Sequence, residues 1–236
     1  MDRILTAVFI TVLLSPALLS AQRAPAPGPD ELQKAVAADL KNRIAELPIY
    51  NGRQHLGYPR SYIGIAYYMT DAWTSGSVLY EGTWYHNLLL KYDLSTDDVI
   101  LQTPGGAALA MIRSRVQEFW LGDAHFSRQP LPGRNDPAFY QLLEQGRMTL
   151  IAVHRKVVEE KILEREVERS FIYSVNYFVI SGGEMHRIKR QKDLTRLLGN
   201  QRQGAVSEMK SKDESFRKNP MAAMITLVKF FNKSAS

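Results

Sequence analysis

The hydrophobic and polar positions follow their clearest pattern in residues 76–101. Three runs of aliphatic, aromatic and β-branched residues alternate with two short polar segments, Glu81-Gly82 and residues 95–98. Such runs favour strands, while Gly accepts the positive φ of a tight turn and Ser and Asp side chains bond the backbone of a wider one. The pattern predicts a β-meander with strands over 78–80, 88–94 and 99–101.

Other apolar runs bounded by turn residues predict further strands. The dipeptides Asn51-Gly52, Gly122-Asp123 and Gly182-Gly183 predict turns. Residues 139–143 predict a short helical turn. The charged segment 155–169 fits either two strand ends joined by a loop at 163–168 or an exposed helix, and we favour the strands. The other expected strands cover residues 62–68, 109–112, 116–121, 148–154, 172–180 and 184–188.

Helical spacing marks both ends of the chain. Asp30 is a candidate N-cap for a helix that ends before Pro48. Towards the C-terminus, residues 193–198 and 205–216 predict two helices, and Asn219-Pro220 supplies the cap and first-turn proline of a third. The apolar faces consist of Leu32, Val36, Leu40, Ile44 and Leu47 in the first helix and Met221, Met224, Ile225, Val228 and Phe231 in the last.

Together these elements predict an α+β fold. A mainly antiparallel, meander-type sheet is expected to curl into a partial barrel or sandwich, with an N-terminal helix and C-terminal helices packed against it. The chain has 236 residues, of which 45% are hydrophobic, which suffices for one core of good size. We expect a single domain over 31–236, β-rich from 49 to 190 and helical from 192 to 232.

The first residues predict export. Arg3 precedes an apolar run, the breaker Pro16 and then small residues, which is the layout of a Sec signal peptide over 1–21. We expect cleavage after Ala21, with cleavage after Ala26 as the alternative site, and a flexible spacer over 22–30. An uncleaved membrane anchor is the other alternative, and Pro16 argues against it. The processed protein is expected in the periplasm or outside the cell, without a transmembrane segment.

Composition and charge narrow the chemistry. The sequence holds no cysteine, which excludes disulfides, thiol chemistry and thiolate metal sites. The net charge is +6, and residues 184–218 contain ten basic and five acidic residues. Because acids interrupt this run, it is typical of solvated helix faces. A weak contact of residues 187–218 with an anionic surface is the functional alternative, and nucleic acid is not expected as a partner.

Catalytic and metal-binding signatures are sparse. The sequence holds no nucleophile elbow, phosphate loop or dinucleotide fingerprint. Asp93, Asp97 and Asp98 lack the spacing of an EF-hand. We therefore expect no catalytic, cofactor-binding or metal-binding residues and no cofactor. The five histidines stand singly, without a second ligand at helical spacing: His55, His86, His125, His154 and His186.

Two groups of residues stay open. Glycosidase carboxylates come from distant strands, so Asp93, Asp123 and Glu144 are candidates only if the fold brings them into one cleft. Aromatic residues in strands are more often core residues or cross-strand pairs than a sugar platform. The aromatics to which both interpretations apply are Trp73, Trp84, Tyr85 and Trp120.

Several motifs resemble a known family. They are Tyr50-Asn51-Gly52, the segments 76–85 and 90–94, and Lys192-Asp193-Leu194 with the closing helices to Phe231-Asn232. In these the chain resembles a family of uncharacterised secreted proteins of Bacteroidetes-type Gram-negative bacteria, from about Tyr50 onward. The motifs are turns and hydrophobic positions, so the resemblance implies a fold and no catalytic residues.

These observations favour an exported, non-enzymatic protein that binds a macromolecule or an envelope ligand. Two alternatives stay open. One is an exported hydrolase that acts on glycans or peptides, and the other is a carrier of an apolar ligand inside the curled sheet.

Overall fold

The computed structural model describes residues 34, 46–130, 137–164 and 166–233. The chain divides into two units, Met1–Lys41 and Asn42–Ser236. Only Lys34 is described in the first unit, so the elements below belong to the second. The expected signal peptide, the spacer and nearly all of the expected N-terminal helix lie outside the described residues.

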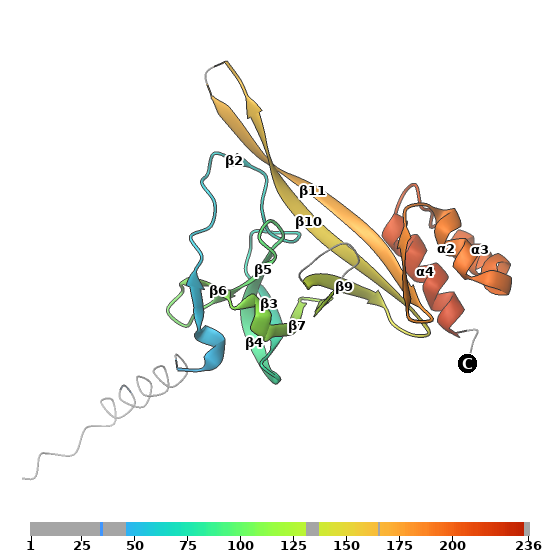
Figure 1. The fold of residues 1–236 in the computed structure, drawn as a ribbon, viewed down its shortest axis with the longest axis horizontal. Coiled ribbons are helices and arrows are strands. Elements are labelled where there is room, and N and C mark those ends of the chain that lie inside the picture. The colour runs from blue at the N-terminus through green and yellow to red at the C-terminus, as the bar shows by residue number, and fades with distance from the viewer. Residues whose placement is uncertain (1–33, 35–45, 131–136, 165, 234–236) are drawn as a thin grey trace, which may run out of the picture. The chain divides into compact units, whose positions relative to one another are not determined.

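Within the described residues, twelve strands form one sheet in the order β1-β6-β5-β4-β3-β7-β8-β9-β10-β11-β12, with β2 beside β11 (Figure 1). Every pairing is antiparallel except that β2 runs parallel to β11. The strands are β1 (Gly52–Gln54), β2 (Tyr62–Ile63), β3 (Thr74–Tyr80), β4 (Thr83–Asp93), β5 (Asp98–Gln102), β6 (Ala108–Met111), β7 (Val116–Leu121), β8 (Ala124–Gln129), β9 (Ala138–Glu144), β10 (Met148–Ile162), β11 (Val167–Ser181) and β12 (Glu184–Ile188).

The sheet is open, which corrects the expected partial barrel or sandwich. Its outermost strands, β1 and β12, pair with β6 and β11 and not with each other. Other segments cover its apolar faces: Ile49 and Tyr68 lie against the meander core, and the C-terminal helices lie against β10 and β11. Because these segments already remove the apolar faces from water, the sheet does not have to close on itself.

The meander predicted for residues 76–101 is confirmed as β3, β4 and β5. The β3–β4 turn consists of Glu81 and Gly82, with φ values of 49° and 79°. In the β4–β5 turn, Asp93 Oδ1 accepts the backbone N–H groups of Ser95 and Thr96 at 2.8 and 3.2 Å. A left-handed dipeptide and a side-chain acceptor therefore set these two turns.

Three local predictions are wrong. Asn51-Gly52 forms no hairpin turn, because the 3₁₀ turn η1 (Pro48–Tyr50) precedes it and Gly52 opens β1. Residues 139–143 lie in β9 and not in a helical turn, since pairing with β8 and β10 overrides the local pattern. The strand expected over 62–68 shrinks to β2, and Tyr67 adds only an isolated bridge to Asp93.

β10 and β11 pair along their entire length of 15 residues each, from Met148↔Ser181 to Ile162↔Val167. The preferred interpretation of residues 155–169, two strand ends and a loop, is confirmed. β9 pairs with residues 150–152 of β10, and β12 pairs with residues 177–181 of β11.

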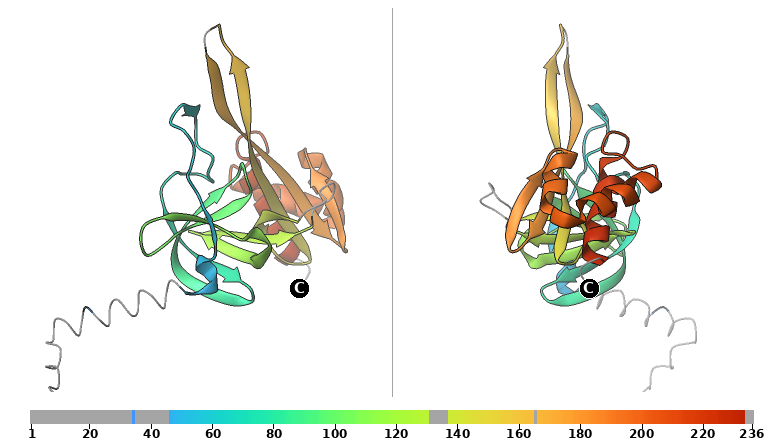
Figure 2. Two further views of the ribbon diagram at one scale, coloured as in Figure 1. Left: turned by 60° about the vertical axis from the view of Figure 1, so that its left-hand side comes forward. Right: turned by 90° about the vertical axis from the view of Figure 1, so that its right-hand side faces the viewer.

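The outer half of the hairpin, residues 157–172, has only β2 as a strand neighbour among the described residues. We call it the arm, and Figures 1 and 2 show it reaching beyond the neighbouring strands.

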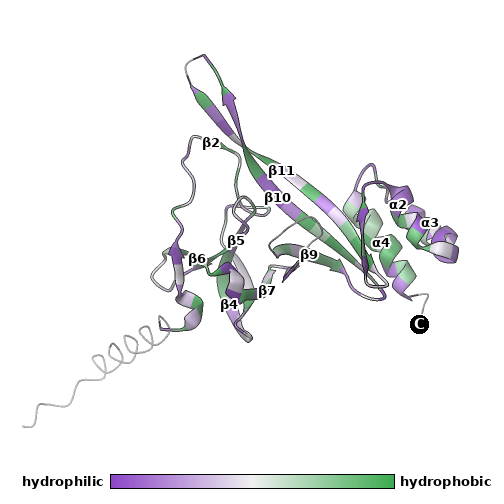
Figure 3. Ribbon diagram, viewed as in Figure 1, coloured by the Kyte–Doolittle hydropathy of each residue, from purple (hydrophilic) through white to green (hydrophobic). Residues whose placement is uncertain are grey.

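Three α-helices follow β12: α2 (Gln191–Leu197), α3 (Arg202–Ser211) and α4 (Pro220–Lys233). The predicted cap of the last helix is confirmed, because Asn219 Oδ1 accepts the backbone N–H of Ala222 at 3.1 Å. α3 begins and ends earlier than the expected range 205–216. α4, largely hydrophobic in Figure 3, buries Met224 and Leu227 in one cluster with Met148 and Leu150 of β10.

Among the described residues, no helix combines the length and the hydropathy needed to cross a membrane.

The pairing of β3 with β7 leads to a first prediction. A Cβ atom on Gly76 would lie 2.2 Å from the carbonyl oxygen of Trp120 and 2.7 Å from Leu90 Cδ1. We expect Gly76→Ala to lower the free energy of unfolding by about 2 kcal/mol, as overpacked cores do. Urea unfolding measures this loss. Gly105→Ala is the control, because its Cβ would meet nothing closer than Thr103 Oγ1 at 3.8 Å, and equal stability of the two variants would contradict the prediction.

Candidate functional site: the arm and the loop at its base

A loop formed by residues 55–73 packs against the base of the arm. Its short strand β2 pairs with Arg169 and Ser170 of β11. The ring of Phe171 contacts the rings of Tyr58 and Tyr62, with centroids 4.9 and 5.5 Å apart. Aromatic contacts of this kind add to the free energy gained by burial. The base of the arm is therefore held by the loop on one side and by the sheet on the other.

Two charged side chains fasten this loop. Asp93 is fully buried and accepts the O–H of Tyr58 at 2.8 Å. Lys156 Nζ donates to the carbonyl oxygens of Ile65 and Tyr67 at 2.7 and 2.8 Å. Burial lowers the pKa of Lys156 and raises the pKa of Tyr58. Because hydrogen bonds to ionised groups are stronger than neutral ones, these contacts fix the loop to β4 and β10.

A neutral histidine completes the base. His154 is buried, its Nδ1 lies 2.6 Å from the hydroxyl of Tyr173, and its Nε2 lies 2.9 Å from Gln141 Oε1. Since Gln141 Oε1 can only accept, Nε2 carries the proton and Nδ1 accepts from Tyr173. Tyr68 donates to the same amide oxygen at 3.3 Å. Burial lowers the pKa of His154 to about 4, so the ring is neutral at pH 7.

A recess of about 440 Å³ lies between this loop, Phe171 and Lys91. Two of its three charged side chains already form an ion pair within the protein. Lys91 Nζ donates to Asp71 at 2.6 Å and lies 4.7 Å from the ring centre of Tyr67 and 4.8 Å from that of Trp73. The recess is thus part of the packing that positions the arm.

The arm itself exposes apolar side chains on both of its faces. Ile162 at the tip is 87% exposed. Cross-strand neighbours are exposed together, Ile162 with Val167 on one face and Val157 with Ile172 on the other. Exposed contiguous apolar residues mark binding surfaces more often than isolated ones do. The complete exposed set is Val157, Val158, Ile162, Leu163, Val167 and Ile172.

One edge of the arm is also open. The backbone N–H of Lys156 bonds the carbonyl of Leu94 at 3.1 Å, so it faces away from β11. Because peptide groups alternate in direction along an antiparallel strand, the N–H groups of Val158 and Glu160 face the same way. Among the described residues, no strand pairs with β10 on that side beyond residue 152. The arm therefore offers unpaired backbone donors and acceptors next to exposed apolar side chains.

The charge of the arm differs from that of the rest of the chain. Residues 157–172 contain five acidic and three basic residues, whereas the chain as a whole carries +6. Among the described residues of the arm, two ion pairs form, between Arg169 and Glu160 at 2.7 Å and between Lys161 and Glu159 at 3.8 Å. A ligand of the arm would meet an apolar surface with an excess of negative charge.

The other histidines lie apart from one another. His55 lies 2.8 Å from the Tyr67 hydroxyl, and burial lowers its pKa. His86 contacts Ser77, His125 contacts Glu118 at 2.9 Å, and His186 lies 3.7 Å from Glu184. Among the described residues, no three His, Asp or Glu side chains gather where they could hold a metal ion.

The four aromatic candidates separate in the structure. Tyr85 packs against the meander core, and the Trp73 ring contacts Lys91. Trp84 and Trp120 are each about two-fifths exposed, and each stacks on a histidine, His86 and His125 respectively. Trp120 and His125 are a directly opposed cross-strand pair of β7 and β8. The four side chains do not form one platform.

The three candidate carboxylates have different surroundings. Asp93 is fully buried and accepts hydrogen bonds from the Tyr58 hydroxyl and from the backbone of the β4–β5 turn. Asp123 is exposed in the β7–β8 turn, and Glu144 is half-buried at the end of β9. Among the described residues, neither is a hydrogen-bond partner of Asp93, and none of the three lines the recess beside the loop 55–73.

Comparison of the chain with protein-family models, with curated proteins and with solved structures finds no match. The resemblance to secreted proteins of Bacteroidetes-type bacteria stays a prediction.

Sequence reasoning missed the residues that build this site. Phe171, Lys156 and the tyrosines of the 55–73 loop meet only through long-range contacts, which leave no local pattern. One signal was available: Val157-Val158 and Ile162-Leu163 place apolar residues within a highly charged segment. In a hairpin, such residues cannot all turn towards a core, and exposure follows.

The His154 network predicts a pH dependence of stability. The pKa of His154 is about 4 in the folded protein, against an ordinary value of 6.5. Between pH 4 and pH 6.5 the unfolded chain therefore binds a proton at this histidine that the folded chain does not bind. The contribution of neutral His154 is complete above pH 6.5 and decreases as the pH falls to 4, by on the order of 3 kcal/mol. Unfolding free energies of the wild type and of His154→Gln at several pH values measure it.

The difference in unfolding free energy between the wild type and His154→Gln separates the contribution of His154 from that of the other titrating groups. We expect the stability of His154→Gln to decline less steeply than that of the wild type in this range. His86→Gln, at an exposed position, is the control and should keep the wild-type slope. Identical slopes for all three proteins would contradict the role assigned to His154.

Proposed function

We propose that the protein is an exported, non-enzymatic binding protein whose arm holds an extended segment of a partner protein. The observation that carries the proposal is the combination, on residues 157–163, of an open strand edge and exposed apolar side chains. An extended peptide can add a strand to such an edge, with main-chain hydrogen bonds providing affinity and neighbouring side chains providing specificity.

The anchoring of the arm supports this function. The loop 55–73, Lys156 and the His154 network hold the base of the arm before any partner binds. A preformed strand edge avoids the entropy cost of ordering a flexible loop on binding. A hairpin of 15-residue strands also presents its tip away from the rest of the sheet.

The partner is expected to be another protein and not a second copy. Two copies of the chain would have to pair antiparallel along their free β10 edges. If Glu159 or Glu160 lay at the centre of that pairing, the same carboxylate of both copies would lie directly opposite each other. The register centred on Val158 places Arg155 opposite Lys161. Like charges directly opposite destabilise a strand pair. The excess of acidic residues on the arm favours a partner segment that alternates apolar with basic residues.

Two substitutions test the arm. Val158→Pro removes a backbone donor from the free edge without removing a bond to β11, because this N–H faces away from β11. Ile162→Asp places a charge on the exposed tip. We expect both variants to fold and to lose the partner, measured by affinity capture from an envelope extract of the cells that make the protein, with the wild type in parallel.

The matched control is Leu56→Asp. Leu56 is 86% exposed, as Ile162 is at 87%, but it lies on the loop and not on the arm. It should retain the partner that Val158→Pro and Ile162→Asp lose. Capture of the same proteins by the wild type and both arm variants would refute the proposed function.

A further inference from the structure

A groove of about 580 Å³ lies at the helical end of the molecule, and its rim is strongly basic. It is bounded by β11 and β12, the turn into α2, and the segment before α4. Four cationic side chains line it: Arg187 from β12, Lys189 and Arg190 from the turn, and Arg217 from the segment before α4. No acidic residue is among the lining residues.

The cations of this groove are not neutralised within the protein. Among the described residues, none of the four forms an ion pair, and Arg187 donates only to the amide oxygen of Asn176. The nearby acid Asp193 accepts the backbone N–H groups of Lys189 and Arg190 at 3.1 and 2.8 Å, so it caps α2. Gathering like charges costs free energy, which a bound anion would recover.

The start of α4 adds to the positive potential. Pro220, its first residue, belongs to the groove lining. The N-terminus of a helix of 14 residues carries a partial positive charge. This charge has the same sign as the side chains around it, so both features select an anion.

The floor of the groove is apolar. Tyr177 and Phe216 line it, and both are partly buried members of the hydrophobic cluster between the sheet and the helices. A cationic rim above an apolar floor suits a ligand that has both a charged head and an apolar body. Arginines bind phosphate oxygens in a bidentate manner, and four cations match a doubly charged group better than a single carboxylate.

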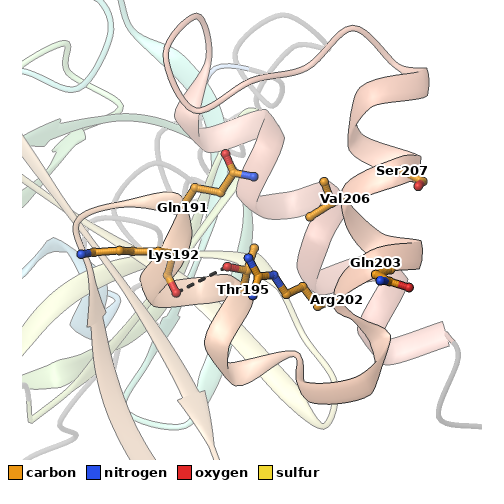
Figure 4. Close-up of a pocket in the computed structure, with 7 residues that line it drawn as sticks. All are labelled: Gln191, Lys192, Thr195, Arg202, Gln203, Val206 and Ser207. Atoms are coloured by element: carbon orange, nitrogen blue, oxygen red, sulfur yellow. Dashed lines mark hydrogen bonds between the residues drawn. The ribbon is translucent and has the colours of Figure 1, made fainter.

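A neighbouring recess between α2 and α3 does not have these properties. It shares Gln191 with the groove and holds two cations, Lys192 and Arg202. Figure 4 shows the Lys192 amine extending away from Arg202, so the two charges do not converge on one point. Its walls are otherwise formed by Gln203, Ser207 and other neutral side chains.

We infer that the groove lined by Arg187, Lys189, Arg190 and Arg217 binds the phosphate head of an anionic amphiphile and places its apolar part against Tyr177 and Phe216. The head can belong to a membrane lipid or to a free amphiphile. The inference is independent of the arm, whose residues 157–172 contribute nothing to this groove.

Titration calorimetry on the full-length chain tests the groove with short-chain phosphatidic acid kept below its micelle concentration. Phosphatidylcholine of the same chain length and inorganic phosphate are the comparison ligands. We expect phosphatidic acid to bind at least about tenfold more tightly than either. Equal binding of the two lipids would overturn the requirement for an anion, and equal binding of phosphate alone would overturn the role of the apolar floor.

A pair of charge-matched variants locates the binding. Lys189→Gln with Arg217→Gln removes two rim charges, and we expect affinity for phosphatidic acid to fall about tenfold or more. Lys210→Gln with Lys229→Gln removes the same charge from exposed helix positions and should change affinity less than about twofold. Equal losses in the two variants, or no binding to the wild type, would overturn the inference.

Vesicles of phosphatidylcholine with and without phosphatidic acid separate the two sources of the head group. Sedimentation with the anionic vesicles supports a membrane lipid as ligand, and binding of the monomeric lipid alone supports a free amphiphile. Tighter binding of a single-stranded oligonucleotide than of phosphatidic acid would overturn the inference in favour of nucleic acid.

The arm variant Ile162→Asp should bind phosphatidic acid like the wild type. Loss of the protein partner at the arm and loss of lipid binding at the groove can therefore be told apart.

Discussion

The continuous pairing of β10 with β11 is the constraint on which the structure depends. One register joins Met148↔Ser181 at the helical end to Ile162↔Val167 at the tip. The inner half is buried between the helices and neighbouring strands, while the outer half has exposed side chains. Because a register shift of one residue would turn the side chains of one strand to the opposite face, burial of Leu150 and Val179 also sets which residues the arm exposes.

The two ends of this hairpin carry different chemistry. The arm combines apolar side chains with excess negative charge, and the helical end gathers cations over an apolar floor. The loop 55–73 and α4 hold the two ends to the same pair of strands. If both proposals hold, binding one ligand at each end of this hairpin would bring a partner protein near an anionic amphiphile.

The sequence predicted the elements whose signal is local. Glu81-Gly82 and Gly182-Gly183 form turns because both residues of each pair take positive φ, and Asn219-Pro220 marks the start of α4. The curvature of the sheet, the strand at 139–143 and the anchoring of the arm depend on pairing between distant residues. The basic run 184–218 was recognised, but its composition could not show that Arg187 and Arg217, 30 residues apart, line one groove.

In this account the arm is a formed hairpin with one open edge before any partner binds. Amide hydrogen exchange, measured residue by residue on the free protein, tests it most directly. The N–H groups of Val157 and Glu159 bond β11 and should exchange slowly, whereas those of Val158 and Glu160 face away and should exchange fast. Equally fast exchange of all four would show that the arm is not formed, and equally slow exchange would show that its edge is not open.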